Sequence, residues 1–167
     1  IVMTTMTSTG KRTAETYLPE ASTVLLVPMD HPLILRRAVN NLRPGLLLIA
    51  ETELWPNLLR TCGKRGIPII LFNGRISEKS FRRYHFFQFF FRGCLRFISL
   101  FLMQTEEDRL RIQKLGAEPS KTRVVGNIKF DQSLPSSTQE KSNELAGSLG
   151  LRGGETLLIA GSTHSGE

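Results

Sequence analysis

The sequence predicts an α/β protein built on a doubly wound parallel sheet. Short apolar runs alternate with segments of helical pattern along most of the chain, and this alternation is typical of βαβ units. Several runs are almost continuously apolar, as expected for parallel strands that helices cover on both faces. The expected strands are residues 1–5, 23–27, 46–50, 67–72, 98–103, 122–125 and 156–160.

The segments between these strands carry signals for helix ends. Pro32 and Pro56 each suit the first turn of a helix, where the missing N–H of proline costs no hydrogen bond. Gly66 favours the end of the helix that follows Pro56. Thr105 is a candidate helix cap, with Asp108 three residues later in a capping-box-like pattern. These signals predict helices that begin near residues 32, 56 and 106.

The alternation stops at residues 131–142, which are rich in Ser, Gln and Pro and indicate a linker. A short helical segment and the last expected strand follow, and they predict the start of a second α/β domain. The chain opens on Ile1 in a strand-like run and stops soon after another strand. We therefore expect a piece of a longer protein, for which the lack of a signal peptide or of a transmembrane run here says nothing about an anchor elsewhere.

Composition limits the classes of function. The chain has 167 residues, a net charge of +7 and a pI near 9.9. This basic excess predicts attraction to phosphate in a nucleotide, a lipid headgroup or nucleic acid, although solvated helix faces explain it as well. Cys62 and Cys94 stand alone in the sequence, which disfavours a zinc site or a disulfide framework. No G-x-G-x-x-G follows the first strand and no G-x-S-x-G occurs, which argues against a dinucleotide-binding dehydrogenase and a nucleophile elbow.

Polar residues gather directly after the expected strands. In an open parallel sheet, ligands bind beyond the carboxyl ends of the strands, so these residues are expected at one rim. Each could be a helix cap or a loop hydrogen bond on its own, but together they predict a ligand site. The set comprises Glu51, Glu53, Asn73, Gly74, Arg75, Gln104, Asn127, Lys129, Asp131, Ser162, Thr163 and His164.

Glu51 and Glu53 give the sharpest prediction at this rim. If the chain stays extended after the strand, the two carboxylates point the same way and lie close enough to perturb each other or to pair with a cation. The alternative is that Glu51 caps the next helix and Glu53 is solvated in its first turn. Arg75 and Lys129 are candidate cations that can stabilise negative charge on a sugar carboxylate or phosphate, and the alternative for both is a plain surface cation.

Two further segments indicate ligand contacts. Residues 162–164, Ser-Thr-His, form a turn whose hydroxyl and N–H groups suit a phosphate. Residues 81–97 contain a phenylalanine cluster and are expected to form a helix with a wide apolar arc. Its polar stripe on a helical wheel comprises Arg82, His85, Gln88, Arg92 and Arg96. This helix either touches a membrane surface or a lipid acceptor, or lies buried between the sheet and its neighbours.

Five short segments indicate a protein family through their order and spacing. They are T-T-M-T-S-T-G at 4–10, A-E-T-E-L-W-P-N at 50–57, N-G-R-I-S at 73–77, G-N-I-K-F-D at 126–131 and G-S-T-H at 161–164. In this order and spacing they resemble the 3-deoxy-D-manno-octulosonic acid (Kdo) transferases of lipopolysaccharide synthesis. The resemblance covers nearly the whole chain, and E-T-E-L-W-P-N is its most specific part.

The resemblance implies a GT-B glycosyltransferase, with two Rossmann-like domains and a cleft between them. Residues 1–130 would then be most of the N-terminal, acceptor-side domain. Residues 131–150 would be a linker and connecting helix, and residues 151–167 the start of a truncated nucleotide-sugar domain. Such enzymes transfer Kdo from CMP-Kdo to a lipid A precursor, lipid IVA. They invert the sugar, use no metal or cofactor, and work at the cytoplasmic side of the bacterial inner membrane; nucleic acid is no expected partner.

The resemblance also implies roles for single residues. Glu51 and Lys129 match family residues that stabilise the transition state, so we expect them to be catalytic. The expected substrate-binding residues are Glu53, Asn57, Arg75, Ser162, Thr163 and His164. The general base of the family lies upstream of this chain and most of the donor site downstream, so this piece alone is expected to be inactive.

Two alternatives remain open from the sequence. One is a GT-B enzyme that uses a different nucleotide sugar and acceptor. The other is a basic, non-catalytic module that binds a membrane or RNA, which predicts salt-sensitive binding to anionic lipid or RNA. Paired glutamates at the end of a strand favour an enzyme over a binding module.

Overall fold

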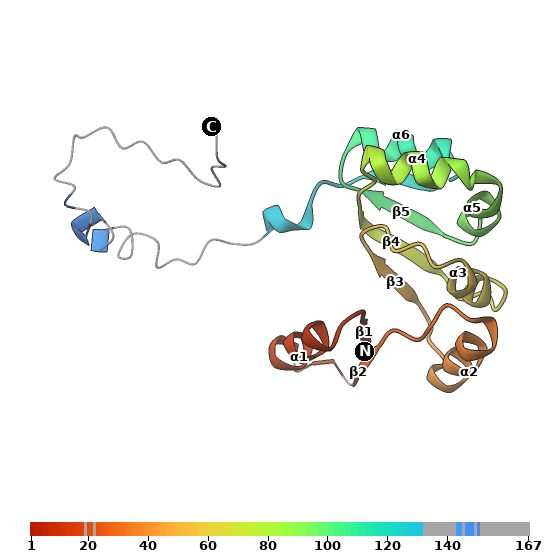
Figure 1. Ribbon diagram of the computed structural model, residues 1–167, viewed down its shortest axis with the longest axis horizontal. Coiled ribbons are helices and arrows are strands. Elements are labelled where there is room, and N and C mark those ends of the chain that lie inside the picture. Colours follow the sequence, from red (N-terminus) through yellow and green to blue (C-terminus); the bar gives the residue numbers. More distant parts are fainter. Residues whose placement is uncertain (19, 22, 132–142, 145, 149, 151–167) are drawn as a thin grey trace. The chain divides into compact units, whose positions relative to one another are not determined.

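The structure is a computed structural model that describes residues 1–18, 20–21, 23–131, 143–144, 146–148 and 150. The chain divides into two units, Ile1–Ile128 and Lys129–Glu167. Strands and helices alternate along the first unit, as Figure 1 shows. Most of the expected linker, the expected strand at 156–160 and the start of the second domain lie outside the described residues.

The α/β class predicted from the sequence is confirmed. Six of the seven expected strands are present within the described residues, and their ends differ from the expected ones by at most two residues. The elements in chain order are β1 (Val2–Thr5), α1 (Ser8–Tyr17), β2 (Thr23–Leu26), α2 (Pro32–Leu42), β3 (Leu47–Ala50), α3 (Pro56–Gly63), β4 (Ile69–Gly74), α4 (Glu78–Phe86), α5 (Gln88–Leu95), β5 (Leu100–Met103), α6 (Glu106–Lys114), the 3₁₀ turn η1 (Pro119–Lys121), β6 (Thr122–Val124) and the 3₁₀ turn η2 (Ile128–Asp131).

The strands pair in parallel, but they form two sheets rather than the single one expected. One sheet pairs β1 with β2, and the other has the order β3-β4-β5-β6. The alternation of strands and helices predicts the direction of each strand but not its neighbour, which explains the difference. In the larger sheet Ile49 lies opposite Leu71, and the β4–β5 register shifts between Leu71 and Gly74. The carboxyl ends of β3, β4 and β5 therefore share one edge.

The core of the first unit lies around the four-stranded sheet. Its fully buried side chains come from the strands and from the helices packed on them, and they include Leu59, Ile69, Leu71, Leu95, Phe101, Met103, Ile112 and Leu115. Each such side chain contributes about 2 kcal/mol by leaving water. This packing fixes the strand ends on which the polar residues sit.

The helix starts follow the sequence signals. Pro32 and Pro56 are the first residues of α2 and α3, and Gly66 has a φ of 70° just after α3 ends. Thr105 caps α6, where its hydroxyl accepts a hydrogen bond from the Asp108 N–H at 3.1 Å. These three helix starts were correctly predicted.

Residues 81–97 differ from the expectation of one continuous helix. The structure has two helices, α4 and α5, separated at Phe87, where φ is −101° and ψ is 24°. This break lets α5 turn so that Cys94 and Leu95 enter the core. The five polar residues of the helical wheel consequently do not form one stripe. No helix within the described ranges is both long and apolar enough to cross a bilayer.

Candidate functional site

The candidate site is the region at the carboxyl ends of β3, β4 and β5, which we call the polar rim. It comprises residues 51–57, residues 73–77 and Gln104. Figure 1 shows the ends of β3, β4 and β5 at one side of the sheet. The sequence prediction that polar residues gather beyond the carboxyl ends of the strands holds for these three strands.

Glu51 leaves β3 in a left-handed backbone conformation. Its φ is 58°, and its N–H still bonds the Phe72 carbonyl of β4 at 2.9 Å. Non-glycine residues adopt this conformation rarely, because the side chain is crowded there. The chain is therefore not extended at Glu51, and the condition under which the Glu51 and Glu53 carboxylates were expected to point the same way is not met. The Glu51 side chain is exposed and, among the described residues, its carboxylate makes no hydrogen bond or ion pair.

A different carboxylate caps α3. Asp30, in the loop after β2, accepts hydrogen bonds from the N–H groups of Asn57 at 3.1 Å and Leu58 at 2.9 Å. These are free donors of the first helical turn, since Trp55 provides no side-chain cap. The alternative in which Glu51 caps this helix is thus not what the structure has. Asp30 caps α3, so the Glu51 carboxylate is not used as a helix cap.

Two other predicted site residues use their polar atoms within the protein. The Asn57 amide donates to the Asp30 carbonyl oxygen at 2.7 Å. The Glu53 carboxylate accepts a hydrogen bond from the Trp55 indole N–H at 3.2 Å. Both contacts hold the segment after β3 in shape, and their roles in substrate binding stay predictions.

Thr52 joins the loop after β3 to the loop after β4. Its hydroxyl accepts a hydrogen bond from the Arg75 N–H at 3.0 Å and donates to the Arg75 carbonyl. The Arg75 side chain is exposed. Because both backbone groups of Arg75 are held, its guanidinium projects from a fixed point of the rim.

Asn73 fixes the other side of the rim. It is buried, with a φ of 52°, and its carbonyl accepts a hydrogen bond from the Gln104 amide at 3.0 Å. Its side-chain oxygen accepts the Ile128 N–H at 3.3 Å. Glu51 and Asn73 thus occupy the same uncommon backbone region at the ends of neighbouring strands. Such conformations persist where the surroundings over-determine them, and they cluster at functional sites.

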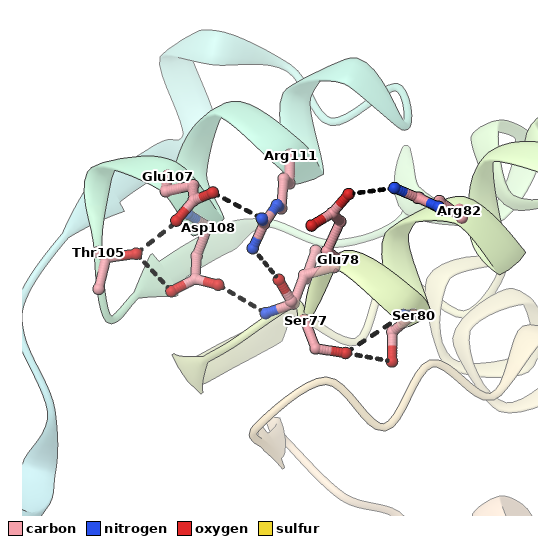
Figure 2. Close-up of polar contacts among 9 residues, drawn as sticks. Ser77, Glu78, Ser80, Arg82, Thr105, Glu107, Asp108 and Arg111 are labelled. Carbon is pink, nitrogen blue, oxygen red and sulfur yellow. Dashed lines mark hydrogen bonds and ion pairs between the residues drawn. The ribbon is translucent and has the colours of Figure 1, made fainter.

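Side chains of α6 bind both backbone polar groups of Ile76, its N–H and its carbonyl. The Asp108 carboxylate accepts the Ile76 N–H at 2.7 Å and the Thr105 hydroxyl at 2.6 Å. The Arg111 guanidinium donates to the Ile76 carbonyl at 2.7 Å. Figure 2 shows Thr105, Asp108 and Arg111 facing the start of α4, where Ser77 caps the helix. Asp108 was expected only as part of a cap, and here it also anchors the rim.

The remaining predicted site residues belong to the second unit. Lys129 belongs to η2, where it is exposed. Ser162, Thr163 and His164 lie outside the described residues. No cluster of His, Cys, Asp and Glu that could hold a metal ion occurs in the part of the chain that the structure describes.

Sequence reasoning missed Asp30 and Thr52. Asp30 stands one residue before His31-Pro32, so its sequence position indicates a cap for α2, whereas its carboxylate binds α3. Thr52 carries no signal of its own inside the E-T-E segment. Both act across loops that are 20 or more residues apart, which a local pattern cannot predict.

The rim as a whole can bind a polar, charged ligand. It offers the Glu51 carboxylate and the Arg75 guanidinium on backbones that hydrogen bonds hold in place. Fixed charges of this kind stabilise charge that develops on a reacting molecule, because they need no reorganisation during the reaction.

Comparisons with known proteins identify the family. The model of the 3-deoxy-D-manno-octulosonic-acid transferase (kdotransferase) family matches residues 1–132. A bifunctional glycosyltransferase/methyltransferase of Fusobacterium nucleatum is 34% identical across the whole chain, which covers 26% of that protein. The 3-deoxy-D-manno-octulosonic acid transferase of Haemophilus influenzae is 31% identical across the whole chain, which covers 39% of it. That of Chlamydia pneumoniae is 29% identical over 98% of the chain and 38% of its own length.

The chain thus spans between about a quarter and two fifths of the length of these relatives. The family model covers the complete first unit, including the polar rim, and it ends just after η2. On this match and on the parallel α/β fold, the chain belongs to the 3-deoxy-D-manno-octulosonic-acid transferase family.

Proposed function

We propose that this chain is the acceptor-side part of a glycosyltransferase that moves Kdo from CMP-Kdo to a lipid A precursor, lipid IVA. Family membership supports the reaction type. The exposed Glu51 carboxylate, presented beside β4 by a left-handed backbone, is the observation that carries the assignment of the site. Because the relatives are much longer than the matched stretch, most of the donor site would come from residues outside this chain.

In the proposed reaction an acceptor hydroxyl attacks the anomeric carbon of Kdo. A C–O bond forms on one face while the bond from that carbon to the CMP phosphate oxygen breaks on the other, which inverts the centre. The hydroxyl proton passes to a general base that lies outside this chain. No metal ion is required, because the monophosphate leaving group can be stabilised by cationic side chains.

The two proposed catalytic residues act on opposite charges. Positive charge develops on the sugar ring in the transition state of glycosyl transfer, and a fixed carboxylate stabilises it, which is the role that we assign to Glu51. Lys129 would stabilise negative charge on the Kdo carboxylate or the departing phosphate. The proposed substrate-binding residues are Glu53, Asn57, Arg75, Ser162, Thr163 and His164.

The test is the Glu51→Gln variant of the full-length protein. We expect kcat for transfer of Kdo from CMP-Kdo to detergent-dispersed lipid IVA to fall by about 10²- to 10³-fold, as when one stabilising group of an active site is lost. KM should change little, because the interaction strengthens only in the transition state. The amide keeps the shape of the side chain, so the loss reports the charge.

The matched control is Glu15→Gln. Glu15 is an exposed glutamate of α1 in an ion pair with Lys11, and its replacement should leave turnover unchanged. Unchanged turnover in Glu51→Gln, with an unaltered unfolding transition, would remove Glu51 from the site. Transfer from another nucleotide sugar in place of CMP-Kdo would contradict the proposed donor while leaving the transferase assignment intact.

The proposed acceptor is a lipid, so we place the reaction at the cytoplasmic face of the bacterial inner membrane. The net charge of +7 supports this placement, since that surface is rich in anionic lipids.

A further inference from the structure

The junction of α4 and α5 exposes a cluster of large aromatic side chains, which we call the phenylalanine corner. Its members are Phe86, Phe87, Phe89 and Phe90, whose exposed fractions are 83%, 54%, 98% and 51%. Phe86 and Phe87 meet edge to face with ring centroids 5.0 Å apart. A protein surface rarely leaves four neighbouring phenylalanines in water, and such a patch marks a surface that binds something.

The corner is not a loosely packed part of the core. The inner aromatic residues of the same helices, Tyr84 and Phe91, stack edge to face at 4.8 Å and pack against the core. Cys94 and Leu95 of α5 are buried. The helices therefore have a closed inner face, and the four outer rings project from an anchored support.

The two helices that carry these rings are rich in positive charge. Residues 78–97 contain five Lys or Arg side chains and one carboxylate, Glu78. Glu78 pairs with Arg82, while Arg83 and Arg96 lie over aromatic rings at 5.5 and 4.9 Å. An exposed aromatic patch on helices rich in arginine suits the membrane interface, where apolar rings enter the lipid and cations meet phosphate.

A shallow groove beside the corner has the same character. Its lining consists of Phe89, Arg92, Gly93, Arg96 and Gly116. Arg92 and Arg96 stand one helical turn apart, and no carboxylate lines the groove. A phosphate group fits between two such guanidinium groups.

We propose that the phenylalanine corner is a membrane-binding surface that seats this protein on an anionic lipid bilayer. The four rings enter the interface, and the groove between Arg92 and Arg96 receives a lipid phosphate. A second copy of the chain is a poorer occupant, because the same arginines would face each other across a symmetric contact. This inference rests on the proposed function, because a lipid acceptor is the reason for the protein to bind a membrane. Its test, however, needs neither CMP-Kdo nor lipid IVA.

The test is flotation of the 167-residue chain with vesicles of phosphatidylethanolamine and phosphatidylglycerol, compared with vesicles of phosphatidylcholine alone. We expect binding to the anionic vesicles that weakens as salt is added. The variant Phe86→Ser/Phe89→Ser should bind about tenfold or more weakly, because it removes two apolar rings from the interface. Arg92→Gln/Arg96→Gln should bind about thirtyfold more weakly, as each arginine near an anionic surface contributes about a factor of five.

Matched controls come from α2, which also exposes an apolar residue and an arginine pair. Leu33→Ser and Arg36→Gln/Arg37→Gln should retain the binding of the unmodified chain. All the substituted side chains at the corner are exposed, so circular dichroism should show unaltered folding. If the α2 variants lost vesicle binding as much as the corner variants, binding would depend on the overall charge and apolar surface of the chain. The corner would then not be the membrane-binding site.

Other results would overturn the proposal as well. Unchanged vesicle binding in both corner variants would do so. A loss of dimerisation in sedimentation, without a loss of vesicle binding, would make a second copy the occupant. Selective loss of single-stranded RNA binding would make the corner a nucleic-acid surface. If vesicle binding behaves as expected while the full-length protein transfers no Kdo from CMP-Kdo, this inference stands and the proposed function fails.

Discussion

The polar rim and the phenylalanine corner lie in the same unit, yet they present opposite chemistry to solvent. At the rim nearly every backbone turn is held by a side chain from another element: Asp30 on α3, Thr52 on Arg75, and Asp108 on Ile76. At the corner four phenylalanine rings project into water. Phe86 meets Phe87 edge to face, and Phe89 shares a groove with Arg92 and Arg96. A reaction needs fixed charges, whereas a surface contact needs apolar area.

The difference explains where substitutions should be costly. Rim residues are coupled to one another through hydrogen bonds between elements, of which the one from the Ile76 N–H to Asp108 is buried. A change at one of them should therefore alter both stability and geometry. Corner rings have few partners within the protein, so their loss should leave the free energy of unfolding almost unchanged.

Asp108→Ala should be the most destabilising change at the rim. It leaves the buried Ile76 N–H without its acceptor and removes the partner of the Thr105 hydroxyl. We expect the free energy of unfolding to fall by about 3 kcal/mol in urea denaturation. Kdo transfer should also fall, because the segment that carries Arg75 loses its anchor.

Asp108→Asn is the companion variant. It keeps a side-chain oxygen for one of the two hydrogen bonds and should lose about half as much stability. A similar stability for Asp108→Ala and the unmodified protein would show that α6 does not anchor the rim, and the contrast with the corner would then disappear.

Two glycines differ in how closely the protein packs around them. A Cβ at Gly63 would lie 2.6 Å from the Phe97 Cβ, whereas a Cβ at Gly93 of α5 would meet no atom within 4 Å. Gly63→Ala should therefore lower the free energy of unfolding by about 1–3 kcal/mol. Gly93→Ala should raise it by about 0.5–1 kcal/mol, because alanine favours the helix. Thermal unfolding of the two variants should give shifts of opposite sign, and a destabilised Gly93→Ala would mean that the outer face of α5 is packed.

The sequence predicts much of this fold because its signals are local. Apolar runs, Pro56 at the start of α3 and Thr105 as a cap act within a few residues, and all three appear in the structure. The left-handed backbone at Glu51 and the break at Phe87 depend on what lies on the neighbouring element, and no local pattern predicts them. The separation into two sheets is not predicted either, because strand pairing depends on contacts between strands that are far apart in the sequence.

The candidate site shows the same division between local and distant causes. Family motifs predict roles for Glu51 and Lys129 without any geometry, and these roles stay predictions, whereas the capping role of Asp30 is seen only in its contact with α3. The exposure of the phenylalanine corner also required the structure. From the sequence, residues 81–97 are consistent with a buried helix and with a membrane-facing helix. Which aromatic rings are exposed depends on how α5 is oriented when Cys94 and Leu95 are buried in the core.

The two cysteines provide the smallest and most local test of the contrast. Burial raises the pKa of the Cys62 and Cys94 thiols above the ordinary value of about 8.5. The thiolate, not the thiol, displaces iodide from iodoacetamide, so both residues should react much more slowly in the folded protein than in urea at pH 8. The neutral thiols also stabilise the folded state. This contribution to the free energy of unfolding is complete below the thiol pKa of the unfolded chain, and it declines as pH rises through the thiol pKa of the folded protein.

Cys94 lies on α5 with its Sγ 3.5 Å from the Phe90 carbonyl, directly beneath the corner. Rapid labelling of Cys94 at pH 8 would mean that the inner face of α5 opens to water, and the phenylalanine corner would then lack the anchored support that distinguishes a binding surface from a frayed helix.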